Sequence, residues 1–133
     1  MKKIEWQKNY EVGNLEIDSE HKVFVRTIQK IQDAVESGTN EKYLARLVTE
    51  LLKYAEFHFY SEENVMLAID YSSILDHKYE HEKLLMELRN LIFTFQLAKQ
   101  GMNELLEFII LWFGNHTTKE DKKLAQAIIR NKT

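Results

Sequence analysis

The chain has no cysteine and no proline, and only four of its 133 residues are glycine. The absence of cysteine excludes disulfides, thiolate metal sites and a thiol nucleophile, so a bound metal would have to be held by histidine, aspartate and glutamate. The scarcity of proline and glycine leaves few points at which a helix must end. The few breaks that do exist are therefore informative.

Long hydrophobic runs and a strong excess of one charge are also lacking. The longest uninterrupted apolar run, residues 108–113, is far too short to span a bilayer, and the N-terminus has no apolar signal core. The net charge of -3 gives no electrostatic reason to expect nucleic acid or an anionic membrane as a partner. We therefore expect a cytoplasmic protein that neither inserts into a membrane nor binds nucleic acid. With 44% hydrophobic residues, the chain can form the core of a single domain over residues 1–133.

Three short breaks separate four segments in which apolar side chains recur at helical spacing. The breaks lie at residues 38–40, 70–73 and 101–103. The predicted helices cover about residues 18–37, 41–69, 73–100 and 103–116. Asp18 or Ser19 is expected to cap the first helix, and Ser73 with Asp76 resembles a capping box for the third.

Residues 1–17 carry large apolar side chains without a helical period, namely Trp6, Tyr10, Val12, Leu15 and Ile17. This composition predicts an ordered arm packed against the helices. Short connections force neighbouring helices to run antiparallel. The predicted fold class is therefore all-α, an up-down-up-down four-helix bundle with an N-terminal arm and a short C-terminal helix over about residues 118–130.

All five histidines of the chain fall into one pattern with two carboxylates. The pattern is His21, His58-x-x-x-Glu62, His77-x-x-x-His81 and His116-x-x-x-x-Asp121. An up-down bundle brings the start of the first helix, the end of the second, the start of the third and the end of the fourth to the same end of the core. These seven side chains are therefore expected to converge in one buried layer.

Spacing within the pairs supports this convergence. Residues i and i+4 differ by about 40° around an α-helix. The pair His58 and Glu62 and the pair His77 and His81 have this spacing, so each pair points two ligands at a shared volume. Residues i and i+5 differ by about 140° on a continuous α-helix. We therefore expect the helix to break between His116 and Asp121, with Thr118 or a neighbour starting the terminal helix.

Five imidazoles and two carboxylates are too many for one zinc ion, which usually takes four ligands. They suit two closely spaced first-row ions bridged by Glu62 and Asp121, because a carboxylate can give one oxygen to each metal. With a bridging hydroxide, the set fills eleven of about twelve positions around two six-coordinate ions. The position left open on a redox-capable ion is where dioxygen would bind, and imidazole-rich coordination is well suited to iron.

These motifs make the chain resemble the hemerythrin family, and within it the single-domain bacterial hemerythrins. The resemblance covers essentially the whole length, and its seven ligand positions follow the family's order and spacing. The matching segments are Trp6, Val12-Gly13, Ile17-Asp18-x-x-His21-Lys22, His58-Phe59-x-x-Glu62-Glu63-x-x-Met66, His77-Lys78-x-Glu80-His81 and Trp112-x-x-x-His116-x-x-x-x-Asp121-Lys122.

The resemblance implies two iron ions (Fe2+/Fe3+) joined by an oxo or hydroxo bridge. One would be held by His77, His81 and His116 and the other by His21 and His58, with Glu62 and Asp121 bridging both. It also implies reversible binding of dioxygen beside the second ion, for storage, delivery or sensing, and no enzymatic turnover. The chain would act as a monomer or homo-oligomer, and an O2-consuming enzyme is a candidate recipient of the oxygen.

Two alternatives use the same residues: a di-iron enzyme that activates O2 or reduces peroxide, and an iron storage or scavenging protein. The chain lacks the Glu-x-x-His pairs of carboxylate-rich bundles that do oxidative chemistry, which favours the carrier. It departs from the family at Thr117, Thr118 and Lys119, where relatives usually have apolar residues. Polar groups in the ligand pocket would shorten the lifetime of the oxygenated state, whereas threonines that face outward or cap the terminal helix would not.

Overall fold

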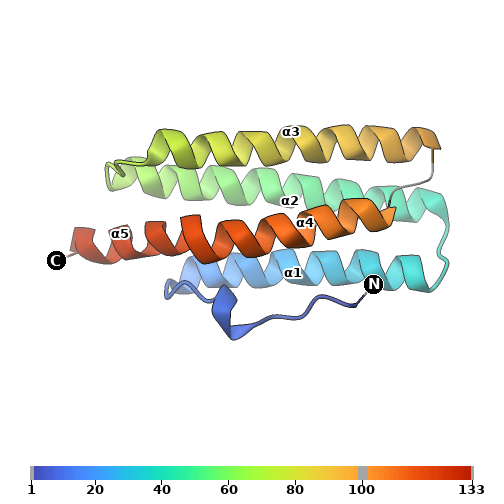
Figure 1. The fold of residues 1–133 in the computed structure, drawn as a ribbon, viewed down its shortest axis with the longest axis horizontal. Coiled ribbons are helices and arrows are strands. Elements are labelled where there is room, and N and C mark those ends of the chain that lie inside the picture. Colours follow the sequence, from blue (N-terminus) through green and yellow to red (C-terminus); the bar gives the residue numbers. More distant parts are fainter. Residues whose placement is uncertain (1, 99–101, 133) are drawn as a thin grey trace.

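The computed structural model describes residues 2–98 and 102–132, and these residues contain helices but no strand. The α-helices are α1 (Leu15–Glu36), α2 (Glu41–Ala68), α3 (Ile74–Ala98), α4 (Met102–His116) and α5 (Lys122–Lys132). A 3-10 turn, η1 (Lys8–Tyr10), precedes α1, and a π-helical turn, η2 (Thr117–Asp121), joins α4 to α5. The helices α1 to α4 lie side by side and alternate in direction (Figure 1). The predicted all-α, up-down-up-down bundle is confirmed.

The first helix begins before the predicted position. The side chain of Asn14 caps it by accepting a hydrogen bond of 3.0 Å from the backbone N–H three residues later. The prediction that Asp18 or Ser19 caps α1 was wrong. The Asp18 carboxylate instead accepts hydrogen bonds from two backbone N–H groups of the arm, that of Val12 at 2.8 Å and that of Gly13 at 3.3 Å. Its role is therefore to hold the arm against the start of the helix.

The later helices follow the breaks in the sequence. Asn40 caps α2 by accepting a hydrogen bond of 2.9 Å from the backbone N–H of Tyr43. The third helix was predicted over residues 73–100, and the structure describes it over Ile74–Ala98. Residues 99–101, which include the end of that prediction, lie outside the described residues. The helix α5 follows α4 beyond η2 at the end of the described residues (Figure 1).

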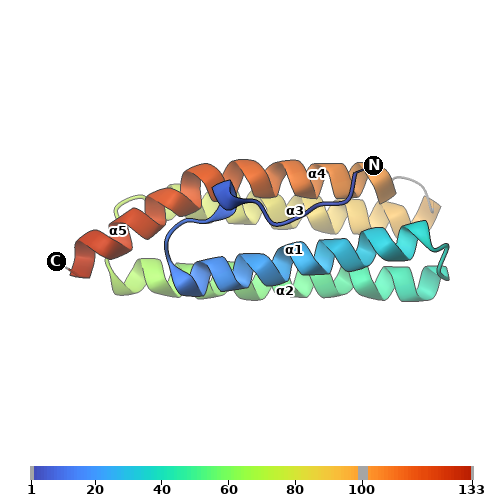
Figure 2. The same ribbon diagram turned by 90° about the horizontal axis from the view of Figure 1, so that it is seen from below.

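The N-terminal arm packs along the bundle as predicted, except that Leu15 and Ile17 belong to α1 and Leu15 is 84% exposed. The side chains of Ile4 and Tyr10 are buried. The backbone of Ile4 is bonded to two glutamines of α1, accepting from Gln29 at 2.8 Å and donating to Gln32 at 2.9 Å. Tyr10 meets the ring of Phe113 edge to face, with centroids 5.1 Å apart. Figure 2 shows the arm running beside α1 and α4.

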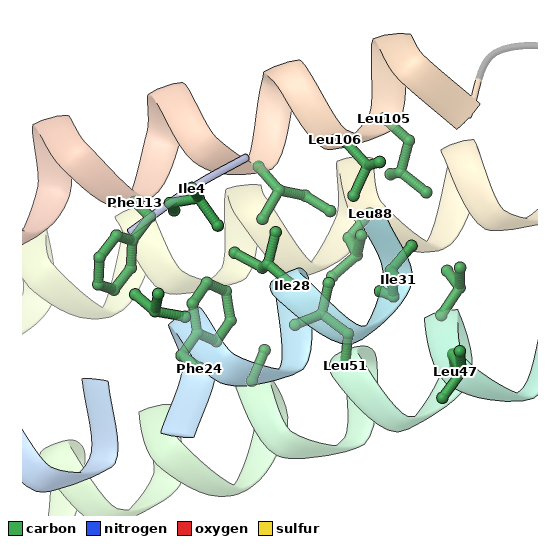
Figure 3. Packing of buried hydrophobic residues seen from close by; sticks show 14 of the residues in the cluster. Ile4, Phe24, Ile28, Ile31, Leu47, Leu51, Leu88, Leu105, Leu106 and Phe113 are labelled. Atoms are coloured by element: carbon green, nitrogen blue, oxygen red, sulfur yellow. The ribbon is translucent and has the colours of Figure 1, made fainter. Parts of the chain in front are cut away.

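Buried apolar side chains form two clusters. The larger one fills most of the bundle, and the part drawn in Figure 3 includes Phe24, Ile28, Ile31, Leu51, Leu88, Leu106 and Phe113. The smaller one closes the end where α5 lies and contains Ile17, Met66, Tyr71, Leu124 and Ile128. Along α1, His21 lies between Ile17 of the smaller cluster and Phe24 of the larger one, and along α2, Glu62 lies between Phe59 of the larger cluster and Met66 of the smaller one. None of the helices in the described parts of the chain combines the length and apolar character that a bilayer span needs.

Candidate metal centre

The five histidines and two carboxylates singled out in the sequence meet in one layer of the bundle. His21 comes from α1, His58 and Glu62 from α2, His77 and His81 from α3, His116 from the end of α4, and Asp121 from the end of η2. Each of these residues is at most 5% exposed. The alternating helix directions thus bring together residues that are up to one hundred positions apart in the chain, between His21 and Asp121.

The seven side chains form two groups that have both carboxylates in common. The first group contains Glu62, His77, His81, His116 and Asp121. The second contains His21, His58, Glu62 and Asp121. Within each group, the candidate ligand atoms all lie within 4.8 Å of one another. Only the two carboxylates are positioned to serve both groups.

Glu62 turns one oxygen toward each group. Its Oε1 lies 3.1 Å from Nε2 of His81 and 3.3 Å from Nε2 of His77. Its Oε2 lies 3.1 Å from Nε2 of His58 and 3.7 Å from Nε2 of His21. The two oxygens of one carboxylate are therefore divided between the groups.

Asp121 is divided in the same way. Its Oδ1 lies 3.1 Å from Nε2 of His77 and 3.1 Å from Nε2 of His116. Its Oδ2 lies 3.1 Å from Nε2 of His21. Both carboxylates consequently have the geometry of bridges between two neighbouring cation positions.

The spacing of these atoms suits metal ions. Two ligands at right angles on one ion, with bonds of about 2.1 Å, are about 3.0 Å apart, and most of the contacts above measure 3.1 to 3.3 Å. Several buried atoms of the centre have no hydrogen-bond partner among the described residues: both oxygens of Glu62, Oδ1 of Asp121, and Nε2 of His77, His81 and His116. Such atoms are costly to bury alone, and cations would satisfy them. The residues present fit a pair of metal ions.

Burial and charge shift the pKa values of the centre. Burial alone would lower the pKa of His58, but the charge of Glu62 and the hydrogen bond to Glu20 outweigh it and raise this pKa to about 10. Burial also tends to lower the pKa of His77, but the nearby carboxylates of Asp121 and Glu62 prevail and raise it to about 9. Although burial raises the pKa of a carboxyl group, the histidines hold those of Glu62 and Asp121 below their ordinary values. Metal ions would therefore compete with protons for the imidazoles.

Two glutamates that the sequence analysis did not select orient histidines of the centre. Oε1 of Glu20, on α1, lies 2.7 Å from Nδ1 of His58 on α2. Oε2 of Glu63, on α2, lies 3.0 Å from Nδ1 of His81 on α3. Each glutamate is adjacent in sequence to a predicted ligand, but neighbours on a helix point about 100° apart. Adjacency was the only signal available, and it does not reveal a contact with the next helix.

The connection between His116 and Asp121 differs from the prediction. The expected break in the helix was wrong, because the backbone stays in the right-handed helical region from His116 to Lys122 and forms the π-helical turn η2. A π-helical turn is closed by i to i+5 hydrogen bonds and contains one more residue than an α-helical turn. Residue i+5 therefore lies on nearly the same face as residue i, and Asp121 joins His116 without interrupting the helix.

Aromatic side chains pack against the histidine rings. Phe59 stacks on His81 with centroids 3.9 Å apart, and Trp112 stacks on His116 at 4.3 Å. Phe113 meets the ring of His21 edge to face at 5.4 Å. These rings keep most of the centre away from water.

A small cavity of about 10 Å³ reaches the centre. It is lined by His21, Phe24, His58, Phe59, Trp112, Phe113, His116, Thr117 and Asp121. The two threonines that depart from the family pattern behave differently here. Thr117 is buried against the cavity, whereas the hydroxyl of Thr118 donates a hydrogen bond of 2.7 Å to the backbone carbonyl of Gly114. Of the two, only Thr117 is among the residues that line the cavity.

Comparison with known proteins gives a consistent result. The family model of the hemerythrin HHE cation binding domain matches residues 13–128. A bacteriohemerythrin from Clostridium acetobutylicum is 27% identical over 130 residues, covering 89% of this chain and 95% of that protein. A bacteriohemerythrin from Methylococcus capsulatus is 30% identical over 106 residues, covering 79% of this chain and 80% of that protein. The solved structure of wild-type hemerythrin superimposes with a TM-score of 0.86 at 25% identity, covering 94% of this chain and 97% of the other.

Proposed function

Because the chain belongs to the hemerythrin family, we propose that it is a non-haem di-iron protein that binds dioxygen reversibly at the centre described above. The proposed ligands are His77, His81 and His116 for one iron and His21 and His58 for the other, with Glu62 and Asp121 bridging the pair. An oxo or hydroxo group would complete the bridge. Iron would supply a redox-capable centre for O2, and the protein would store, deliver or sense oxygen.

The observation that carries this proposal is that the two groups differ in their number of histidine ligands. One group offers three histidines and two carboxylates, and the other offers two histidines and the same two carboxylates. Six-coordinate ions that share one bridging oxygen would be filled on the first side and one ligand short on the second. A small ligand such as O2 would therefore be taken up on the side of His21 and His58, which is also a side that the cavity reaches.

The residues around the centre support a carrier. The helix faces supply the donors and fix their orientation, and Glu20 and Glu63 hold two imidazoles by their Nδ1 atoms. Phe59, Trp112 and Phe113 cover the rings and limit the access of water. A cavity of about 10 Å³ beside the ligands has no room for an organic substrate.

The test begins with anaerobic loading of the purified protein with ferrous iron and a metal count. Two irons per chain are expected, followed by a new visible absorption band on exposure to O2 and its disappearance when O2 is removed. A loaded protein that is oxidised irreversibly, or that turns over peroxide or another substrate, would favour the di-iron enzyme over the carrier. Uptake of many irons per chain would favour storage. A chain that binds no iron would contradict the proposal.

A further inference from the structure

Thr117 differs from the other helical threonines whose side chains the structure describes. The hydroxyls of Thr27, Thr49 and Thr118 each donate to the backbone carbonyl four residues earlier, at 2.9, 2.9 and 2.7 Å. Thr117 is only 1% exposed, yet its Oγ1 has no hydrogen-bond partner among the described residues. A buried hydroxyl without a partner is costly, and this is a reason to look for a ligand.

The position of Thr117 supplies the second observation. The residue belongs to η2, between the candidate ligands His116 and Asp121, and it lines the cavity shared with His21 and His58. The other residues of that cavity are the aromatic side chains Phe24, Phe59, Trp112 and Phe113. The hydroxyl of Thr117 is thus the only hydroxyl among the residues that line the cavity and are not candidate metal ligands.

From these two observations we propose that Thr117 determines which small ligand the cavity accepts, by donating a hydrogen bond from Oγ1 to that ligand. The inference rests on the proposed function, because the ligand is the one taken up beside His21 and His58. The ligand class is a species of one or two heavy atoms that carries negative charge on an acceptor atom when bound, such as fluoride, or dioxygen that has taken up electron density from the metal. A cavity of about 10 Å³ is close to the volume that one water molecule needs, so larger species do not fit.

The hydrogen bond has a consequence for selectivity. A ligand that accepts it satisfies the buried hydroxyl, whereas a ligand of the same size without a good acceptor leaves the hydroxyl unpaired. An apolar residue at this position would not distinguish the two. The two threonines of η2 differ in this respect, because the hydroxyl of Thr117 does not bond to the carbonyl four residues earlier whereas that of Thr118 does.

The experiment compares Thr117→Val, which removes the hydroxyl at nearly constant shape, with Thr117→Ser, which keeps it. Thr118→Val is the matched control, because it removes the neighbouring hydroxyl that donates to Gly114. The first measurement is thermal unfolding of the metal-free proteins. Thr117→Val is expected to unfold a few degrees above the wild type, because it removes an unsatisfied donor, and Thr118→Val is expected to unfold below it.

The second measurement is calorimetric titration of the diferric proteins with fluoride, with the metal-free proteins as blanks. Thr117→Val should bind fluoride about 10- to 100-fold more weakly, as expected for the loss of a hydrogen bond to a charged acceptor, and Thr117→Ser should restore most of the affinity. Thr118→Val should bind fluoride as the wild type does.

The outcomes separate this inference from the proposed function. Equal fluoride affinity in Thr117→Val and the wild type would overturn the role of Thr117 while leaving the di-iron centre intact. A metal-free Thr117→Val protein that is less stable than the wild type would show that the hydroxyl already has a partner in the protein, and would also overturn it. A wild-type protein that takes up no iron would contradict the proposed function itself.

Discussion

Glu20 and His58 are joined across two helices, with Oε1 of the glutamate 2.7 Å from Nδ1 of the imidazole. Because Nδ1 is engaged in this way, Nε2 is the atom that His58 turns toward Glu62, at 3.1 Å. A carboxylate on the far side of a ligating imidazole fixes its tautomer and orientation and makes it more basic. His81 has the same relationship with Glu63, so each of the two groups has one histidine that is oriented by a carboxylate.

Replacing Glu20 with glutamine should weaken metal binding without unfolding the protein. The amide can still accept a hydrogen bond but carries no charge, and changes of this kind typically cost 10- to 100-fold in metal affinity. The measurement is competition with a chelator of known affinity. Glu16→Gln, on an exposed position one turn earlier in α1, is the matched control. An affinity equal to that of the control would show that Glu20 does not orient the ligand.

Replacing a proposed bridging carboxylate should lower the bound iron content more than replacing a histidine that belongs to only one of the two groups. Glu62→Ala or Asp121→Ala takes one ligand from both groups at once, whereas His58→Ala takes a ligand only from the smaller group. We expect the alanine variants of the carboxylates to retain little iron and His58→Ala to retain close to one iron per chain. Metal counts on freshly loaded protein provide the measurement.

The control for these variants is Glu56→Ala, which removes an exposed acid that pairs with Arg89 at 3.0 Å on the surface. It should keep the full metal content, because exposed ion pairs contribute little. If Glu62→Ala lost only one ion, the assignment of this carboxylate as a bridge would be wrong.

Metal loading should release protons at neutral pH. In the metal-free protein the pKa of His58 is raised to about 10 and that of His77 to about 9, so both imidazoles are protonated near pH 7.5. A metal ligand must be neutral, and each of these protons has to leave when the ion binds. Because both pKa values are raised, metal affinity should increase as the pH rises toward 9 to 10 and decrease as it falls.

The release can be measured by titration calorimetry in two buffers that differ in their enthalpy of ionisation. The apparent binding enthalpy should differ between the two buffers at pH 7.5, and this difference should be smaller at pH 10. Equal enthalpies in both buffers at pH 7.5 would mean that the imidazoles are already neutral in the metal-free protein, and would contradict the prediction.

Phe113→Ala should destabilise the metal-free protein by about 3 to 5 kcal/mol. The ring is 3% exposed and lies against the rings of Tyr10, His21 and Phe24, at centroid distances of 5.1, 5.4 and 5.2 Å. Its removal leaves a void where the arm, α1 and α4 meet. Denaturant unfolding of the metal-free protein measures the change in free energy.

The same substitution at Phe93, which is 64% exposed on α3, is the control and should change the stability by no more than about 0.5 kcal/mol. A similar effect at both positions would indicate that Phe113 does not hold the arm and the two helices together.

A secondary effect of Phe113→Ala is expected in the loaded protein, where a wider and wetter cavity should shorten the lifetime of the oxygenated form.

The spacing of the histidines and carboxylates was enough to predict a shared site because two regularities act together. Helical repeats place residues i and i+4 on one face, and antiparallel packing brings alternate helix ends to the same level. The prediction was wrong at His116 and Asp121, because a spacing of five is compatible with a helix break or with a π-helical turn. Backbone hydrogen bonds decide between them, and η2 has no distinctive composition.

The amino-acid sequence by itself determined the fold class, and its periodicity, composition and residue chemistry were enough to propose a two-metal site with seven donors. Only the tertiary structure decided which atoms face which partner. It showed that Glu62 and Asp121 divide their oxygens between two groups, that Glu20 reaches His58, and that Thr117 lines the cavity while Thr118 does not. The physical reason is that contacts between helices depend on their rotation and separation, which residue spacing along one helix does not specify.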